Sequence, residues 1–229
     1  MKIFNFGLDI EPGKYKYKNE CFDKLVAKFA PQKETYYTVE FLDGDLEKCD
    51  AVAFNSAKKL DLVLIDLEKI ENRILRCEDV EEKNTLRKAQ ELLEKEMLLC
   101  DSDLPEQARN VFRQLQLVTN KPCLGLDKVE NVNDLISALI DKSGILLFFT
   151  AGKKEVRIWD IKKGESILEA AGRIHSDLKR GFIKAEVTRA ADLDKFFNMA
   201  EARSKGLVQV VDKDYIMQEN DIIEIRFSV

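Results

Sequence analysis

Two helix-length apolar patterns in the middle of the chain constrain its fold more than any other feature. The first pattern places Leu60, Leu64, Leu67 and Ile74 on one face, with Val63 and Ile70 beside them. The second pattern consists of Leu86, Ala89, Leu93, Met97 and Cys100. Spacings of three and four residues predict one apolar face on each helix. Ser102 followed by Pro105 predicts the start of a third helix. We therefore expect residues 57–119 to form an antiparallel helical hairpin with a third helix beside it.

Short strand-like segments lie on both sides of this helical region. Before it, residues 3–8, 35–42 and 50–54 predict strands and residues 19–29 a helix; after it, residues 122–126 predict a strand and 132–142 a helix. The last third of the chain predicts short strands interspersed with short helices. The strands are expected at 145–150, 155–159, 181–189, 207–212 and 221–227, and the helices near 166–174 and 192–200. The chain therefore predicts an α/β part and a separate α+β part.

Composition excludes several classes of protein. Hydrophobic residues make up 45% of the 229 positions and charged residues 34%, which excludes a disordered chain. The apolar runs are too short for a membrane span or a signal peptide, so we expect a cytoplasmic protein without membrane contact. The five cysteines include no C-x-x-C pair, and only one histidine is present, so we expect reduced thiols and no metal site. The net charge of −5 is uneven: residues 61–104 carry −6 and residues 145–229 carry +1.

Longer motifs carry a family resemblance. The last third contains FFTAGKKEVRIWDIKKG, AAGRIHSDLKRGFIKAEV and DYIMQENDIIEIRF, and earlier stretches read LEKIENRI at 67–74 and QLQLVTNKP at 114–122. With these motifs the chain resembles the YchF subfamily of Obg-type GTPases, most closely over residues 144–229. The resemblance implies a reduced P-loop-type α/β domain (residues 1–56 and 120–144), an inserted helical domain (57–119) and a β-grasp, ubiquitin-like TGS domain (145–229).

The expected nucleotide loop departs from the P-loop pattern. A P-loop reads G-x-x-x-x-G-K-[S/T], so that successive amides surround the phosphate and the hydroxyl holds Mg²⁺. Here Gly7 and Gly13 enclose five residues instead of four, and Lys14 is followed by a tyrosine. Pro12 removes an amide donor, and the loop also contains two acidic residues. Gly7, Gly13 and Lys14 are therefore interpreted as the remnant of a nucleotide-binding loop.

Other nucleotide motifs of the family are also missing. The D-x-x-G pattern occurs only at 141–144, after the helical region, and Lys128 stands where the base-recognition asparagine aligns. We therefore expect no catalytic residues, no nucleotide cofactor and no hydrolysis. The main hypothesis is a catalytically inactive binding or regulatory module. The alternatives are a divergent GTP- or ATP-binding protein that uses Mg²⁺ and a rearranged loop around Lys14, and a small-molecule sensor.

A partner surface is predicted in the C-terminal third. TGS domains of related proteins are associated with RNA and the ribosome, so the resemblance implies a ribosome, RNA or protein partner, and we expect no DNA. The candidate residues for this surface are Lys162, Lys163, Arg173, His175, Lys179, Arg180 and Lys184. The alternative interpretation is that these side chains form an ordinary solvent-exposed surface without a partner, and that His175 orders its own loop. Trp159 is interpreted as a core or inter-domain anchor rather than a base-stacking platform.

Overall fold

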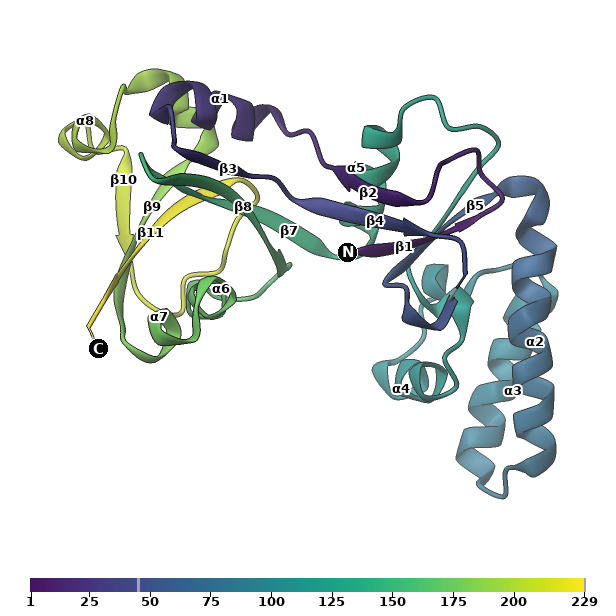
Figure 1. Cartoon of the computed structure of the whole chain (residues 1–229). Coiled ribbons are helices and arrows are strands. Elements are labelled where there is room, and N and C mark those ends of the chain that lie inside the picture. Colours follow the sequence, from purple (N-terminus) through teal and green to yellow (C-terminus); the bar gives the residue numbers. More distant parts are fainter. Residues whose placement is uncertain (45, 229) are drawn as a thin grey trace. The chain divides into compact units, whose positions relative to one another are not determined.

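The structure is a computed structural model that describes residues 1–44 and 46–228 and divides into two units. Unit 1 contains residues 1–15 and 39–143, and unit 2 contains residues 16–38 and 144–229. The strands are β1 (Lys2–Phe6), β2 (Gly13–Lys16), β3 (Lys33–Thr35), β4 (Thr38–Leu42), β5 (Ala51–Asn55), β6 (Cys123–Leu126), β7 (Ile145–Ala151), β8 (Glu155–Lys162), β9 (Phe182–Arg189), β10 (Val208–Val211) and β11 (Asp221–Phe227). The α-helices are α1 (Glu20–Phe29), α2 (Lys59–Arg76), α3 (Val80–Glu94), α4 (Glu106–Gln114), α5 (Val132–Lys142), α6 (Ile167–Ile174), α7 (Ser176–Arg180) and α8 (Met199–Ser204) (Figure 1).

The sheet of unit 1 has the strand order β2-β4-β1-β5-β6, and β4, β1, β5 and β6 run parallel. Strand side chains alternate between the two faces of this sheet. Phe4, Val52 and Phe54 belong to the buried cluster shared with α2, α3 and α4. Alanines 51 and 53 lie at the alternate positions of β5, toward the opposite face. Helix α5, which contacts β6, buries four apolar side chains, at positions 135, 136, 139 and 140.

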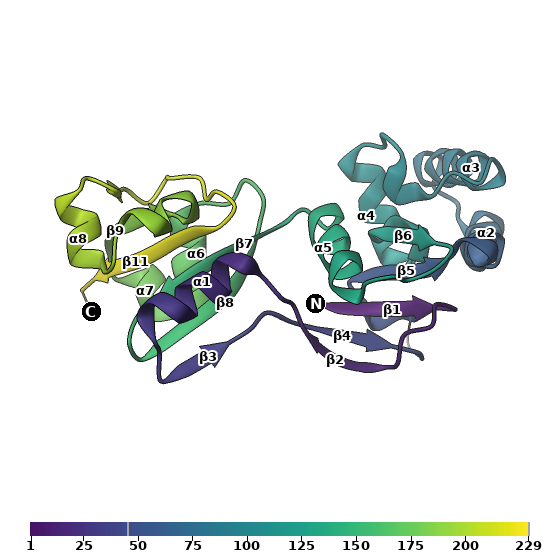
Figure 2. The same cartoon turned by 90° about the horizontal axis from the view of Figure 1, so that it is seen from above.

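Helices α2 and α3 form the hairpin, between strands β5 and β6 that pair within one sheet (Figures 1 and 2). The buried face of α2 differs in part from the one that the sequence suggests. Leu60 and Leu64 are 53% and 59% exposed, whereas Leu62 is buried together with Val63 and Ile70, which were expected beside that face. Leu67 and Ile74 are partly buried against the same cluster. The difference is a rotation about the helix axis, because residues two positions apart lie on different sides of a helix.

The sheet of unit 2 has the order β10-β9-β11-β7-β8-β3. Strands β7 and β8 form an antiparallel hairpin, β11 lies parallel to β7, and β9 pairs antiparallel with both β10 and β11. Helix α6 contacts β8 and β9 over a cluster that includes Phe148, Ile167 and Val187. The helix expected near 192–200 is instead a 3₁₀ turn at 190–195 followed by α8.

Residues 16–38 lie with unit 2, whereas the expected division places them in residues 1–56 of the α/β part. Helix α1 buries Phe22 and Leu25 and contacts β7 and β8. Strand β3 pairs in parallel with β8, and the Thr35 hydroxyl donates to the Glu155 carboxylate at 2.6 Å. The strand expected over residues 35–42 is therefore divided between two sheets, since β3 belongs to unit 2 and β4 to unit 1.

No helix among residues 1–44 and 46–228 is both long enough and apolar enough to cross a membrane.

Candidate functional site

The carboxyl ends of four parallel strands meet at one edge of the unit 1 sheet. Gly7 follows β1, Asp43 follows β4, and Asp127 follows β6, while β5 ends at Asn55. In open α/β sheets, ligands bind in the crevice outside the carboxyl ends of the strands. This edge, defined here by Gly7, Asp43, Asn55 and Asp127, is the candidate site of unit 1.

The loop after β1 is closed on itself. The side chain of Asn5 donates to the carbonyl oxygens of Leu8 and Ile10 at 3.0 Å each and accepts from the Leu8 N–H at 3.0 Å. The Ile10 N–H donates in turn to the Leu8 carbonyl at 2.9 Å. A phosphate cradle needs loop amides that point at the anion. Because the Leu8 and Ile10 amides are satisfied within the loop, this segment does not fit a triphosphate in the manner of a P-loop.

The structure separates the remnant residues from one another. Gly7 directly follows β1 and has a φ of +82°, whereas Gly13 and Lys14 lie within strand β2. Lys14 is exposed there, and the Tyr15 hydroxyl next to it donates to the Glu11 carbonyl at 2.8 Å. A lysine in a strand cannot take the place of one at the start of a helix that follows a phosphate loop.

Another lysine lies at the end of β1. Lys58 comes from the 3₁₀ turn (Ser56–Lys58) that links β5 to α2. A β-carbon at Gly7 would lie 2.7, 2.8 and 2.9 Å from Cδ, Cε and Nζ of Lys58. The Lys58 ammonium also lies 5.7 Å from the centroid of the Phe6 ring. Lys58 is exposed, and no carboxylate within the described ranges forms an ion pair with it.

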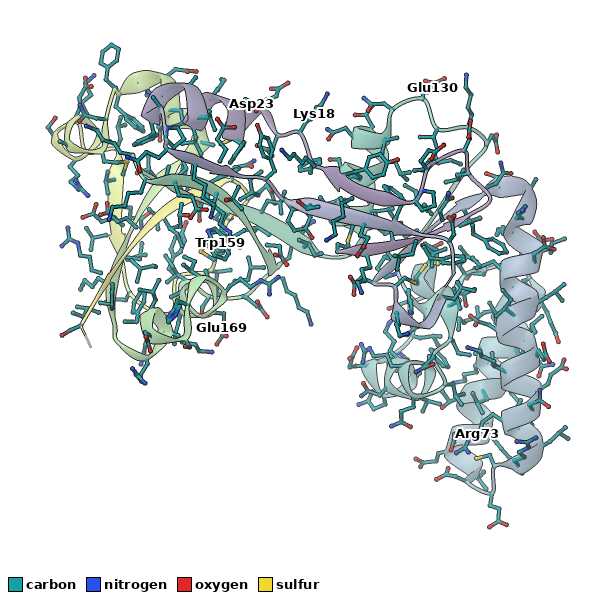
Figure 3. The ribbon with its side chains drawn as sticks, viewed as in Figure 1. Lys18, Asp23, Arg73, Glu130, Trp159 and Glu169 are labelled. Carbon is teal, nitrogen blue, oxygen red and sulfur yellow. The ribbon has the colours of Figure 1, made fainter. Side chains whose placement is uncertain are left out.

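Most of the predicted basic surface of unit 2 is neutralised by carboxylates of the same unit. Lys179 pairs at 2.6 Å with Glu169 of α6, which is labelled in Figure 3. Arg180 pairs with Asp177 at 2.9 Å, Lys184 with Asp212 at 3.3 Å and Arg173 with Asp160 at 2.7 Å. Lys162 and Lys163 lie apart from these pairs, at the end of β8 and just after it. The positive charge that this surface offers to a polyanion is therefore smaller than the sequence suggests.

His175 and Trp159 both have internal contacts. The His175 Nδ1 accepts from the Asp177 N–H at 3.1 Å, so this side chain caps α7. The Trp159 indole N–H donates to the Thr150 hydroxyl at 3.0 Å, and the Arg157 guanidinium lies 3.7 Å from its ring centroid. One face of the indole is therefore covered by an arginine of the same strand.

No group of three or more histidine, cysteine or acidic side chains in the described part of the chain is arranged to hold a metal ion.

Several known proteins are similar to this chain. Residues 145–228 match the family model YchF-GTPase_C, whose description reads "Protein of unknown function (DUF933)". A Bacillus subtilis protein named ribosome-binding ATPase YchF is 29% identical, over 80% of this chain and 68% of its own length. A Mycoplasma genitalium protein of the same name is 29% identical, over 95% of this chain and 61% of its own length. Over most of its length the chain is similar to proteins named YchF.

Two further similarities point to the same group of proteins. An Obg-like ATPase 1 from Caenorhabditis elegans is 37% identical, over 55% of this chain and 29% of its own length. The solved Schizosaccharomyces pombe YchF GTPase superposes with a TM-score of 0.78 over 95% of this chain and 88% of that one, at 17% identity. At that identity the superposition establishes a shared fold. The chain spans about two thirds of the length of the Bacillus and Mycoplasma proteins.

These findings contradict two expectations from the sequence. The relatives are named ATPases or a GTPase, which argues against a catalytically inactive module and against the absence of a nucleotide cofactor. The error arose because the departure of residues 7–14 from the P-loop pattern was taken to mean the loss of nucleotide binding. Lys58 was not singled out because it belongs to no recognisable sequence motif, and only the fold brings it to the end of β1.

Proposed function

We propose that this chain is a ribosome-associated protein that binds a nucleoside triphosphate at the carboxyl edge of the unit 1 sheet and hydrolyses it slowly. The observation that carries the proposal is the position of Lys58 against Gly7. An exposed ammonium without a carboxylate partner among the described residues is a suitable group for a phosphate. The names of the relatives support the nucleotide, and the sheet edge is where α/β proteins hold ligands.

The fit of a nucleotide to this edge is partial. The Leu8 and Ile10 amides are already satisfied within the loop, so the phosphate would depend on Lys58 for charge compensation. Asp43, which directly follows β4 beside β1, is the residue suited to a magnesium ion, since Mg²⁺ prefers carboxylate oxygens and keeps several waters. Bound Mg²⁺ would neutralise phosphate charge during hydrolysis. This division of roles replaces the one expected for Lys14.

Unit 2 supports the ribosomal part of the proposal. We infer that its sheet with helix α6 across one face is a β-grasp TGS domain, enlarged by residues 16–38, and that it contacts the ribosome. The proteins from Bacillus subtilis and Mycoplasma genitalium are named ribosome-binding, and the YchF-GTPase_C match covers residues 145–228 of this unit. The degenerate loop and the helical insertion remain features of unit 1 in this proposal.

The test is a titration of the full chain with fluorescent ATP and GTP analogues in the presence of Mg²⁺. Replacing Lys58 by alanine should weaken binding roughly tenfold, the effect of losing one charged contact of about 1.4 kcal/mol. Lys14→Ala is the matched control, because it removes an exposed lysine from the neighbouring strand β2, and it should change the affinity less than about twofold. Binding that depends on Lys14 and not on Lys58, or no binding of either nucleotide at millimolar concentration, would refute the proposal.

A further inference from the structure

Helix α2 carries a second apolar stripe besides the one that packs into the core of unit 1. Helices α3 and α4 both lie to one side of α2 (Figures 1 and 2). On the side away from the core, Leu60, Leu64 and Leu75 are 53%, 59% and 83% exposed. Single exposed leucines are ordinary on a protein surface, so the arrangement of these three decides whether they form a binding face.

The three leucines lie on one face of the helix. At about 100° per residue, Leu60, Leu64 and Leu75 fall within about 60° around the helix axis. Leu67, which is partly buried, borders them. The stripe from Leu60 to Leu75 is about 22 Å long, at about 1.5 Å per residue, which is roughly four helical turns. An apolar stripe of this length and spacing is the type of face that pairs with another helix.

The charged residues on the same face are all acidic. Asp61, Glu68 and Glu71 are interleaved with the leucines around the helix, and all three are exposed. In the part of the chain that the structure describes, none of the three carboxylates takes part in an ion pair. We call this surface the acidic leucine face, and it consists of Leu60, Asp61, Leu64, Glu68, Glu71 and Leu75.

The basic residues of α2 lie outside this face. The Lys69 ammonium donates to the Gln116 carbonyl at 3.1 Å, and Arg73 pairs with a glutamate of α3 at 2.7 Å. Lys59 lines a pocket beside β6, and Arg76 is the last residue of the helix. The three carboxylates of the face are therefore not offset by cations of the same face. Their charge agrees with the net charge of −6 over residues 61–104.

Charge distinguishes between the occupants that an apolar stripe could have. A second copy of this chain would bring two sets of three carboxylates together, and like charges at close range repel. A nucleic acid or an anionic lipid surface would be repelled for the same reason. A helix with lysines or arginines beside its apolar stripe has the complementary charge, and the aliphatic stems of those side chains can also cover leucines.

We propose that the acidic leucine face of α2 binds a basic amphipathic helix of a partner protein. The apolar side chains of that helix would cover the three leucines, and its cations would face the three carboxylates. This proposal concerns the outer side of the helical hairpin and does not depend on nucleotide binding at the carboxyl edge of the sheet.

The experiment is a fluorescence anisotropy titration of the full chain with a labelled, capped lysine–leucine peptide of about 15 residues, with its leucines at helical spacing. Leu64→Gln/Leu75→Gln should weaken binding about tenfold, because it removes apolar contact area. Glutamine is a good helix former, and both positions are exposed, so α2 should stay folded. The matched control is Ile183→Gln/Val210→Gln, at apolar positions of unit 2 that are 56% and 50% exposed. It should leave the affinity within about twofold.

A second pair of variants tests the charge. Glu68→Gln/Glu71→Gln should weaken the peptide about fivefold, whereas Glu81→Gln/Glu91→Gln, at two exposed positions of α3, should change the affinity less than about twofold. Equal weakening by both charge variants would show attraction to total charge and would overturn the proposal. Equally tight binding of a glutamate–leucine peptide would do the same. So would dimerisation of the chain in sedimentation equilibrium that is lost in Leu64→Gln/Leu75→Gln, because the face would then belong to a second copy.

Discussion

Asp66 and Thr119 are 53 positions apart in the chain, and the Asp66 carboxylate accepts from both the N–H and the hydroxyl of Thr119, at 2.7 and 2.6 Å. It also accepts from the Val118 N–H at 2.8 Å. Both Asp66 and Thr119 are fully buried. Burial raises the pKa of Asp66, and the three hydrogen bonds oppose that rise. The contact ties the middle of α2 to the turn that leads back into β6.

Replacing Asp66 by alanine should therefore destabilise unit 1. The change leaves two buried backbone N–H groups without an acceptor, and we expect a loss of about 2–4 kcal/mol in the free energy of unfolding. Hydrogen exchange of residues 115–121 measures the effect locally. Asp61→Ala, an exposed position in the first turn of the same helix, should cost less than about 0.5 kcal/mol. Equal protection of residues 115–121 in both variants would contradict the role assigned to Asp66.

A second prediction concerns Gly7. Its φ of +82° is unfavourable for other residues, and a β-carbon there would collide with the Lys58 side chain. Gly7→Ala should cost about 1–2 kcal/mol of stability and displace Lys58 from the end of β1. Nucleotide affinity should then fall about as far as in Lys58→Ala, and the two changes combined should be less than additive. Gly44→Ala is the control, because a β-carbon at that position meets open space. Unchanged nucleotide affinity in Gly7→Ala would contradict the contact between Lys58 and the phosphate.

Sequence patterns predicted where helices and strands occur better than they predicted which elements pack or pair together. The hairpin helices, the strand before them and the strand after them all occur at the expected places. The division of residues 35–42 between two sheets could not be predicted, because β-propensity does not say which sheet a strand joins. The start of the α2 face was misjudged, because Leu60 and Leu64 continue the apolar stripe and yet are exposed, whereas Leu62 is buried. Only packing against the sheet decides between them.

The candidate sites show the same limit. Motif reasoning placed a phosphate-binding lysine at Lys14, but the lysine beside the β1 glycine is Lys58, 51 positions from Gly7 in the chain. Counting basic residues identified the surface of unit 2, but the pairs Lys184–Asp212 and Arg173–Asp160 join residues far apart in sequence. Neutralisation by distant carboxylates cannot be seen in a local charge count.

A third prediction follows from Glu186, a carboxylate that is only 2% exposed on the unit 2 sheet. It accepts from Arg203 at 2.7 Å and from Arg226, and Arg203 also donates to Glu224 at 2.7 Å. Burial alone would raise the pKa of Glu186, but the two arginines outweigh it, and the pKa lies below its usual value of 4.5. A lowered folded pKa means that this carboxylate stabilises unit 2 above about pH 4.5 and that its contribution is lost as the pH falls further.

Glu186→Gln should therefore lower the stability of unit 2 at pH 7 by about 1–3 kcal/mol and flatten its decline between about pH 5 and pH 3. The single tryptophan, Trp159, lies in unit 2, so its fluorescence during denaturation reports on this unit alone. Glu224→Gln removes a more exposed partner of the same arginine and should have a smaller effect. A pH profile that keeps the wild-type slope in Glu186→Gln would show that other carboxylates cause the acid sensitivity.

The last prediction concerns the basic surface of unit 2 and a polyanion. Glu169 and Asp160 neutralise Lys179 and Arg173, so Glu169→Gln with Asp160→Asn should release two cations and raise the net charge of residues 145–229 from +1 to +3. If this surface meets RNA, binding of the full chain to single-stranded poly(U) should strengthen several-fold at moderate salt. The slope of log K against log salt should steepen by about 1.4, near 0.7 for each added phosphate contact.

The control is Asp192→Asn with Asp194→Asn, which changes the charge equally and releases Lys195 and Lys24 elsewhere on unit 2. The total charge rises equally in both variants. An equal gain in RNA affinity in the control would therefore mean that binding depends on net charge and that the predicted surface has no particular role.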